Sequence, residues 1–128
     1  MDKNGADDPA AGLEKGIREF NAGDFYEAHD TWEETWQGVR GPERLFFQGM
    51  IQLAIGFYHL TCENYPGAEH LLTRGIEKLG AYLPDHRQVD LADLVIRSAE
   101  ALEWVVAIRA ERGEGYEETL IPQIQRVK

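Results

Sequence analysis

The chain has 128 residues, 43% of them hydrophobic and 28% charged, which is the composition of one globular domain rather than of a disordered segment. Its 23 acidic and 13 basic side chains give a formal net charge of −10. That charge argues against a nucleic-acid binder and against binding to an anionic membrane, because both need a basic surface. Arginines outnumber lysines, which together with the acidity is compatible with a halophilic, high-salt cytoplasm.

The first nine residues, MDKNGADDP, are predicted to be a disordered leader, and residues 10–128 to form a single helical domain. The leader lacks the apolar stretch of a signal peptide. Cys62 is the one cysteine of the chain, so an intrachain disulfide is excluded. A reducing compartment fits this cysteine content, and we expect a cytoplasmic protein.

Five helices are predicted in chain order, because no segment keeps the alternating pattern of a β-strand. Asp24 and Asp90 are expected to cap two of them, and Pro42 and Pro66 suit first helical positions. The tail after residue 112 is expected to form a short last turn that packs on the bundle and is interrupted by Pro122. The predicted ranges are 10–21, 24–37, 42–63, 66–83 and 90–112.

The third predicted helix has no charged residue between positions 45 and 62, which is at the lower limit for a membrane span. Gln48, Gln52 and His59 lie within that run and would be costly in lipid. A helix covered by its neighbours explains the run better. The chain is therefore predicted to be an all-α bundle of five or six helices around a central apolar helix at 42–63, with mostly antiparallel neighbours.

The second predicted helix contains FYEAHDTWEETW, in which a histidine and a glutamate interrupt an apolar side. On a helical wheel, His29 lies near the middle of that side and Glu33 at its margin. The other acidic residues, Glu27, Asp30 and Glu34, share an arc that a solvated face explains. His29 and Glu33 therefore need another explanation.

The polar residues of the third predicted helix also share one side. Gln48, Gln52 and His59 occupy a stripe roughly 40° wide on the wheel. If the second and third helices are antiparallel neighbours, this stripe can meet His29 and Glu33 and form a polar cluster. The expected aromatic walls of the cluster are Trp32, Trp36, Phe57 and Tyr58.

Four interpretations of these residues are open, and one of them is that the two polar sets do not face each other. In a second, Glu33 orients a buried His29 in a structural network that the glutamines complete. In a third, His29, Glu33 and His59 bind a divalent metal ion, although HExxH and paired ExxH motifs are absent. In the fourth, the cluster is a small-molecule pocket in which Glu33 or His29 transfers a proton. The binding residues of that pocket would be Trp32, Trp36, Gln48, Gln52 and Tyr58.

Other polar residues have ordinary explanations. Solvent exposure explains His70 on a helix and His86 in a loop. Arg74 and Arg97 could place a cation near the cluster, but a surface ion pair is the default interpretation for each. Cys62 ends a buried helix and is predicted to be packed rather than reactive.

Four segments together resemble the family known as domain of unknown function 309, over about residues 13–105. They are FYEAHDTWEETW, FFQGMIQLAIGFYHL, NYPGAEHLLTRGIEKL and VDLADL. The pairing of an HxxxExxW element with a QGxIQ element is more specific than either alone. The resemblance implies an all-α bundle and no established activity. The family pattern falls on His29, Glu33, Trp36, Gln48, Gly49, Gln52, His59, Gly67 and Ala68.

Two classes of function follow from these observations. The first is a domain that binds a metal ion or a small molecule, with His29, Glu33 and His59 as its central residues. The second is a helical protein–protein interaction module in which the polar cluster is structural. The sequence decides neither whether the protein is an enzyme nor its partner or oligomeric state.

Overall fold

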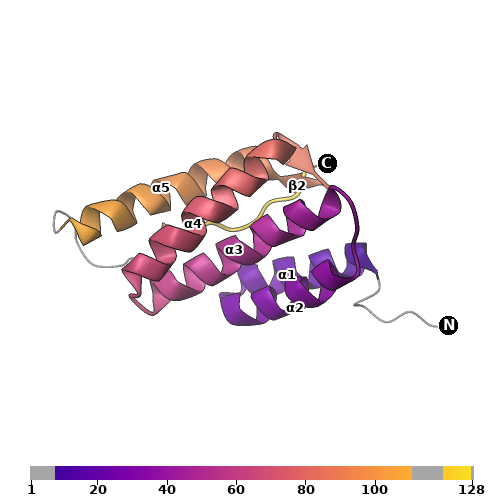
Figure 1. The fold of residues 1–128 in the computed structure, drawn as a ribbon, viewed down its shortest axis with the longest axis horizontal. Coiled ribbons are helices and arrows are strands. Elements are labelled where there is room, and N and C mark those ends of the chain that lie inside the picture. Colours follow the sequence, from indigo (N-terminus) through magenta and orange to yellow (C-terminus); the bar gives the residue numbers. More distant parts are fainter. Residues whose placement is uncertain (1–7, 111–119, 128) are drawn as a thin grey trace.

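The computed structural model describes residues 8–110 and 120–127, and these contain five α-helices. The helices are α1 Pro9–Asn21, α2 Phe25–Gln37, α3 Glu43–Thr61, α4 Tyr65–Leu79 and α5 Leu91–Arg109. The all-α prediction is confirmed, and helices that follow one another run antiparallel (Figure 1). Most of the predicted leader lies outside the described residues, but Asp8 and Pro9 begin α1. The predicted end of the fifth helix near residue 112 also lies outside them.

Polar side chains define where three of the helices begin. Asp8, Asn64 and Asp90 each accept a hydrogen bond from a backbone N–H in the first turn of α1, α4 and α5 respectively. These bonds satisfy donors that have no partner within a helix. Asp24 precedes α2 as predicted, but its side chain makes no such bond.

The fourth helix ends at Leu79 rather than at Leu83. A 3₁₀ turn, η2 Gly80–Tyr82, follows it, and then an antiparallel hairpin of β1 Asp85–His86 and β2 Val89–Asp90. The earlier end has a local reason, because Pro84 disfavours helical backbone at the residue before it. Arg87 and Gln88 form the hairpin turn with φ values of 51° and 65°.

The C-terminal segment packs on the bundle as predicted, but most of it is extended rather than helical. Arg126 forms a β-bridge with Val89, and the N–H of Asp90 donates to the carbonyl of Gln125 at 2.9 Å. Ile124 enters the core with 4% of its surface exposed. The segment thereby connects the hairpin to the end of α1.

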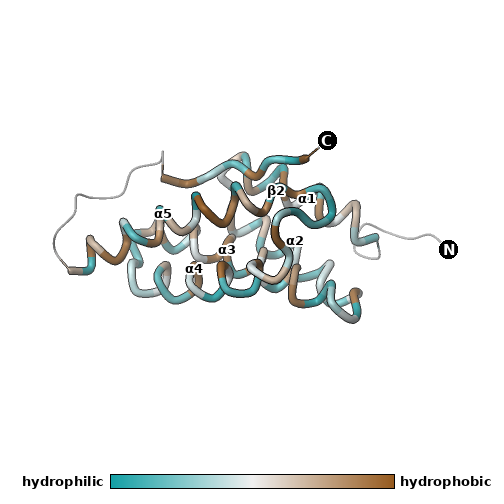
Figure 2. The backbone as a smooth tube through the Cα atoms, turned by 90° about the horizontal axis from the view of Figure 1, so that it is seen from above, coloured by the Kyte–Doolittle hydropathy of each residue, from teal (hydrophilic) through white to brown (hydrophobic). Residues whose placement is uncertain are grey.

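The central position predicted for the third helix is confirmed (Figures 1 and 2), and hydrophobic stretches recur along all the helices around it. On one side of α3, the ring of Phe57 lies 5.8 Å from that of Phe20 and 6.2 Å from that of Phe25. On another side, Gly56 lets α4 approach so closely that a Cβ atom there would come within 2.8 Å of Leu72. Of the helices within the described residues, none is long and apolar enough to cross a bilayer.

A third side of α3 is not covered by these contacts. Its residues recur every three or four positions and are all half-buried, and we call them the outer stripe: Arg44, Gln48, Gln52, Ile55 and His59. Because α2 covers one side of α3 and α4 covers another, the outer stripe lies between α2 and α4.

A cluster of charges joins the start of α3 to the hairpin. The carboxylate of Glu43 lies 3.0 Å from Nε2 of His86 and 2.6 Å from Nε of Arg87. Burial raises the pKa of Glu43, but the hydrogen bonds and charges of Arg87 and His86 outweigh burial and bring this pKa below its ordinary value. Arg87 and His86 therefore hold Glu43 in its ionised form.

Two single-residue predictions are wrong. His86 is not a solvated loop residue, because it contacts Glu43 and its ring lies 4.6 Å from that of Phe46. Cys62 is exposed rather than packed. It follows the last turn of α3, beyond Leu60, where the buried side of that helix ends.

Candidate functional site

His29 of α2 lies between two carboxylates of its own helix. Its Nε2 is 3.7 Å from Oε1 of Glu33, and its Nδ1 is 3.3 Å from Oδ1 of Asp30. The contact with Asp30 has an ion-pair distance but not hydrogen-bond geometry, so the buried Nδ1 has no hydrogen-bond partner among the described residues. The His29 side chain is 17% exposed, whereas Asp30 and Glu33 are 62% and 49% exposed. The histidine is therefore nearly covered while its two carboxylates reach solvent.

The same three residues form the one potential metal-ligand group in the part of the chain that the structure describes. Their ligand atoms all lie within 4.8 Å of one another. Asp30 was not among the sequence-predicted ligands, because the helical wheel places it on the solvated arc. In the sequence, the feature that indicates Asp30 is its position next to His29. The imidazole ring is oriented so that its Nδ1 lies 3.3 Å from the Asp30 carboxylate.

Trp36 and Gln52 each bury a polar atom that has no hydrogen-bond partner within residues 8–110 and 120–127. These atoms are Nε1 of the Trp36 indole and Oε1 of the Gln52 amide. The Arg44 guanidinium lies over the indole, 4.1 Å from its centroid, and donates to the carbonyls of Trp36 and Val39. Trp36 is thereby fixed beside the first turns of the outer stripe.

The packing of Tyr26 on Tyr58 gives the alignment of α2 with α3, since their ring centroids are 5.3 Å apart. In antiparallel helices, a step forward along one corresponds to a step back along the other. Trp36 therefore lies near Gln48 along the bundle, one turn from Gln52. These residues and His29 lie on the α2–α3 side of the molecule, as the small-molecule interpretation expects.

His59 lies at the other end of the outer stripe. Its Nδ1 is 3.2 Å from Nδ2 of Asn64, and a Cβ atom on Gly67 would come within 2.9 Å of its ring. Its immediate contacts are thus with the α3–α4 turn and the start of α4. The metal-ligand group of α2 contains Asp30 where the sequence prediction had His59.

Trp32 points away from the outer stripe. It is fully buried, its Nε1 donates to the carbonyl of Leu13 at 3.3 Å, and it fills the space left by Gly16 of α1. We therefore leave Trp32 out of the candidate site. Gln48 and Tyr58, by contrast, are half-buried and stay within it.

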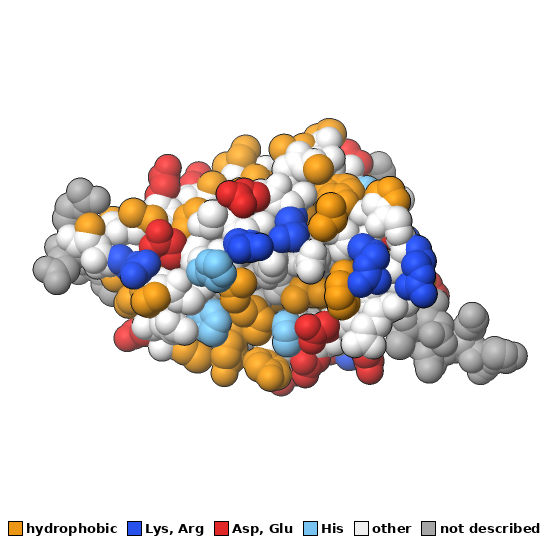
Figure 3. All heavy atoms as spheres, viewed as in Figure 1, with side chains coloured by type: hydrophobic (Ala, Val, Ile, Leu, Met, Phe, Trp, Pro, Cys, Tyr) orange, Lys and Arg blue, Asp and Glu red, His pale blue; other side chains and the backbone are white. Residues whose placement is uncertain are grey.

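Figure 3 shows this side of the molecule. Histidine and hydrophobic side chains gather over α2, α3 and the start of α4, and basic side chains lie across the middle of the view. The face thus combines histidine, hydrophobic and basic side chains.

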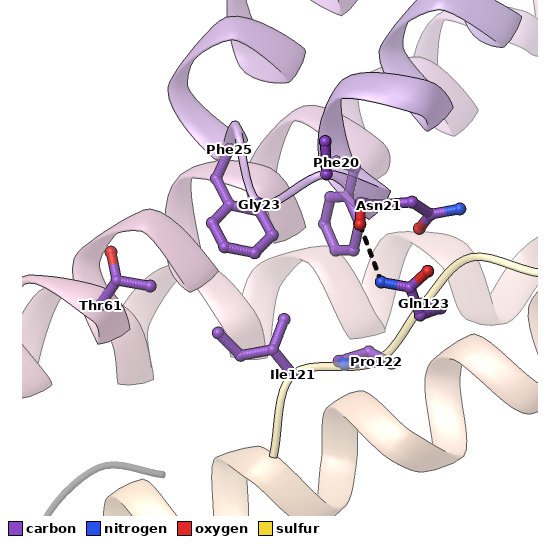
Figure 4. A pocket seen from close by; sticks show the side chains of 9 residues that line it. Phe20, Asn21, Gly23, Phe25, Thr61, Ile121, Pro122 and Gln123 are labelled. Carbon is purple, nitrogen blue, oxygen red and sulfur yellow. Dashed lines mark hydrogen bonds between the residues drawn. The ribbon is translucent and has the colours of Figure 1, made fainter. Parts of the chain in front are cut away.

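A separate pocket of about 360 Å³ lies where the α1–α2 turn meets the C-terminal segment (Figure 4). The rings of Phe20 and Phe25 line it, and its polar groups bond to one another. Gln123 Nε2 donates to the carbonyl of Asn21, and the Asn21 side chain pairs with the backbone of Ile124. The unpartnered buried side-chain atoms found among the described residues belong to none of the residues that line this pocket.

Comparison with known families identifies part of the chain. Residues 13–71, from α1 to the first half of α4, match the family described as a domain of unknown function, DUF309. This segment is similar to the DUF309 family. The predicted resemblance is thereby confirmed, although the match ends at residue 71 rather than near 105. The DUF309 segment contains His29, Asp30, Glu33, Trp36 and the whole outer stripe.

The chain is also similar to a protein of Bacillus subtilis (strain 168) described as uncharacterized protein YpuF. The two are 32% identical over 108 residues, which is 81% of this chain and 59% of that relative. The chain thus spans less than two thirds of the length of the relative it matches. Neither the family nor the relative carries a described activity, so a function has to be argued from the site.

Proposed function

We propose that this DUF309 domain binds a small polar molecule on the outer stripe of α3, next to Trp36 and His29 of α2. The observation that carries the proposal is the pair of unpartnered buried atoms, Trp36 Nε1 and Gln52 Oε1. The first can only donate a hydrogen bond and the second can only accept one. Leaving such a buried group unpaired costs roughly 1–3 kcal/mol, so unpaired groups in native folds call for an explanation.

A ligand with one acceptor and one donor would satisfy both atoms. Both belong to half-buried residues at the surface, so a modest side-chain rotation brings each atom to a bound molecule. Tyr58 would add an aromatic wall, and Gln48 a second amide. His29 and Glu33 lie at the margin of the same face, where they would exchange a proton with the ligand if the domain catalyses a reaction.

Substituting Gln52→Leu tests this proposal without knowledge of the ligand. Leucine fills a similar volume and removes the unpaired acceptor. We expect the free energy of unfolding, measured by urea denaturation, to stay the same or to rise by about 1 kcal/mol. If Gln52 instead completes a satisfied structural network, the same change lowers the free energy of unfolding by about 1–3 kcal/mol.

Gln48→Leu is the matched control, because Gln48 lies one turn away on the same stripe and is not among the described residues that bury an unpartnered atom. It reports the general effect of a leucine at a half-buried position of this helix. A loss of stability in Gln52→Leu that Gln48→Leu does not share would contradict the proposal. It would favour the alternative function, a protein-interaction module with a structural polar cluster.

A second candidate function, metal binding, has an observation of its own. His29, Asp30 and Glu33 together offer the imidazole and carboxylate ligands that suit a divalent ion such as Zn²⁺. Asp30 and Glu33 also line a hollow of about 450 Å³ between α1 and α2, through which an ion would reach them. A single helix would supply all three ligands, so the proposed site is open and holds the ion with water as well.

A further inference from the structure

The basic residues of this acidic protein are distributed unevenly. Among the described residues, six lysines and arginines lie within ion-pair distance of a carboxylate: Lys15, Arg18, Arg87, Arg97, Arg109 and Arg126. In the same part of the chain, Arg40, Arg44, Arg74 and Lys78 have no carboxylate at that distance. The default surface-pair interpretation thus holds for Arg97, which bonds to Asp93, whereas Arg74 has no such pair with another described residue.

Of these four cations, Arg44 belongs to the outer stripe, and the other three lie around it. Lys78 of α4 lies against α3, since a Cβ atom on Gly49 would be 3.2 Å from Cβ of Lys78. Arg74 lies one turn earlier in α4, on the same side of that helix. The contacts of α4 with α5, made by Tyr65 and Glu69, are on a different side.

The remaining two cations lie at the other edge. Arg44 begins the outer stripe and covers the Trp36 indole, and Arg40 is exposed in the loop between α2 and α3. Figure 3 shows basic side chains extending across this face. Within residues 8–110 and 120–127, the cations without a carboxylate partner thus lie around the outer stripe, which holds Gln52, and its neighbour Trp36.

From this arrangement we propose that the ligand of the outer stripe is a small phosphate ester. The inference rests on the proposed function and names its ligand class. A phosphate group carries roughly 1.5–2 negative charges near neutral pH, more than the single charge of a carboxylate, and therefore suits a face with several cations. Lysine and arginine are the side chains that bind phosphate, as a point charge and as a two-pronged donor.

The remaining groups fit the rest of such a molecule. Trp36 Nε1 would donate to a phosphate oxygen, and Gln52 Oε1 would accept from a hydroxyl or amine of the ester. Arg44 is already bonded to two carbonyls near the end of α2, so it positions the indole, and Arg74 and Lys78 supply the charge that is available to the ligand.

Calorimetric titration of the whole chain with inorganic phosphate, at low ionic strength, tests this inference. We expect the double variant R74Q/K78Q to bind phosphate at least about tenfold more weakly than the wild type. The matched control is R97Q/R109Q, which removes the same two charges from α5, where both arginines are engaged in ion pairs. The control should bind within about twofold of the wild type.

Two results would overturn the inference. One is the absence of phosphate binding by the wild type, and the other is equal weakening in the two double variants, which would show a general effect of net charge. Circular dichroism establishes that each variant is folded before titration. The proposed function is tested independently of the ligand class, because the Gln52→Leu experiment requires no ligand. A stabilising Gln52→Leu together with no phosphate binding would retain the site and reject this ligand class.

Discussion

At the scale of single residues, His29 is the most informative side chain of the site. It is 17% exposed and its Nδ1 has no hydrogen-bond partner in the described part of the chain, yet both of its nitrogens face carboxylates. Removing a histidine from a buried network leaves its partner charge without compensation. Here Glu33 is 49% exposed, so water would solvate the carboxylate that remains. We therefore expect removal of His29 to affect metal binding more than it affects the stability of the fold.

We predict that His29→Ala lowers the free energy of unfolding by less than about 1.5 kcal/mol while weakening Zn²⁺ binding about tenfold or more. The first effect is small because the His29 side chain makes no hydrogen bond with another described residue. The second follows from removal of the one imidazole of the group. Urea denaturation measures the first and calorimetric titration with Zn²⁺ the second.

Glu34→Gln is the control for the zinc titration, since Glu34 is an acidic neighbour on α2 that is not part of the ligand group. Equal zinc affinity in the wild type and His29→Ala would reject the metal site. A stability loss of several kcal/mol in His29→Ala would show instead that the cluster is structural.

The periodicity of α2 separated His29 and Glu33 from the solvated acidic residues, and the geometry of the helix keeps them one turn apart. It could not separate Trp32 from Trp36, which share one arc of the wheel. That difference depends on α1, where Gly16 leaves room for the Trp32 ring. The hydrophobic periodicity of one helix does not reveal a contact of this kind with another helix.

At the scale of elements, the position of α3 depends on its first turn. Glu43 there contacts His86 and Arg87 of the hairpin, and their charges hold its pKa below the ordinary value of 4.5. A carboxyl group whose pKa is lower in the folded chain than in the unfolded chain stabilises the fold when it is ionised. This stabilisation is complete above the unfolded pKa and is lost as the pH falls through the folded pKa.

We therefore predict that Glu43→Gln lowers the free energy of unfolding by about 1–3 kcal/mol near pH 6, and that the difference from the wild type is smaller at pH 3, because the stabilisation is lost as the pH falls toward the lowered pKa of Glu43. Urea denaturation at the two pH values gives the measurement. Glu14→Gln serves as control, because Glu14 is exposed and its ion pairs are long, at 3.8 Å to Arg18 and 3.6 Å to Arg126. A Glu43→Gln deficit that persists unchanged at low pH would contradict this account of the hairpin contact.

The helices themselves could be predicted from local signals, because capping side chains and prolines act on the nearest turn. Asp90, which was predicted as a cap, shows this at the start of α5, and Asp8 and Asn64 act in the same way at the starts of α1 and α4. The path of the C-terminal segment could not. It depends on pairing of Arg126 with Val89, which lie far apart in the sequence. Non-local pairing of this kind has no local pattern.

At the scale of the whole molecule, the core contains features that stabilise the fold, whereas the proposed site contains features that cost stability. The core around α3 is closely packed, while the outer stripe and Trp36 beside it keep two polar atoms and several positive charges unpaired within the described residues. A fold of this size is stable by only about 5–15 kcal/mol, so features that cost stability persist where function requires them. The central claim is that Trp36 Nε1 and Gln52 Oε1 serve a ligand and do not bond to each other.

A double-mutant cycle of Trp36→Phe and Gln52→Leu, followed by urea denaturation, tests that claim most directly. The cycle cancels the contacts that each change disturbs alone, including the stacking of Arg44, and leaves the interaction between the two side chains. We predict a coupling energy near zero, within about 0.5 kcal/mol. A favourable coupling of about 1 kcal/mol or more would show that the indole and the amide satisfy each other within the folded protein, and it would contradict the binding site proposed for this domain.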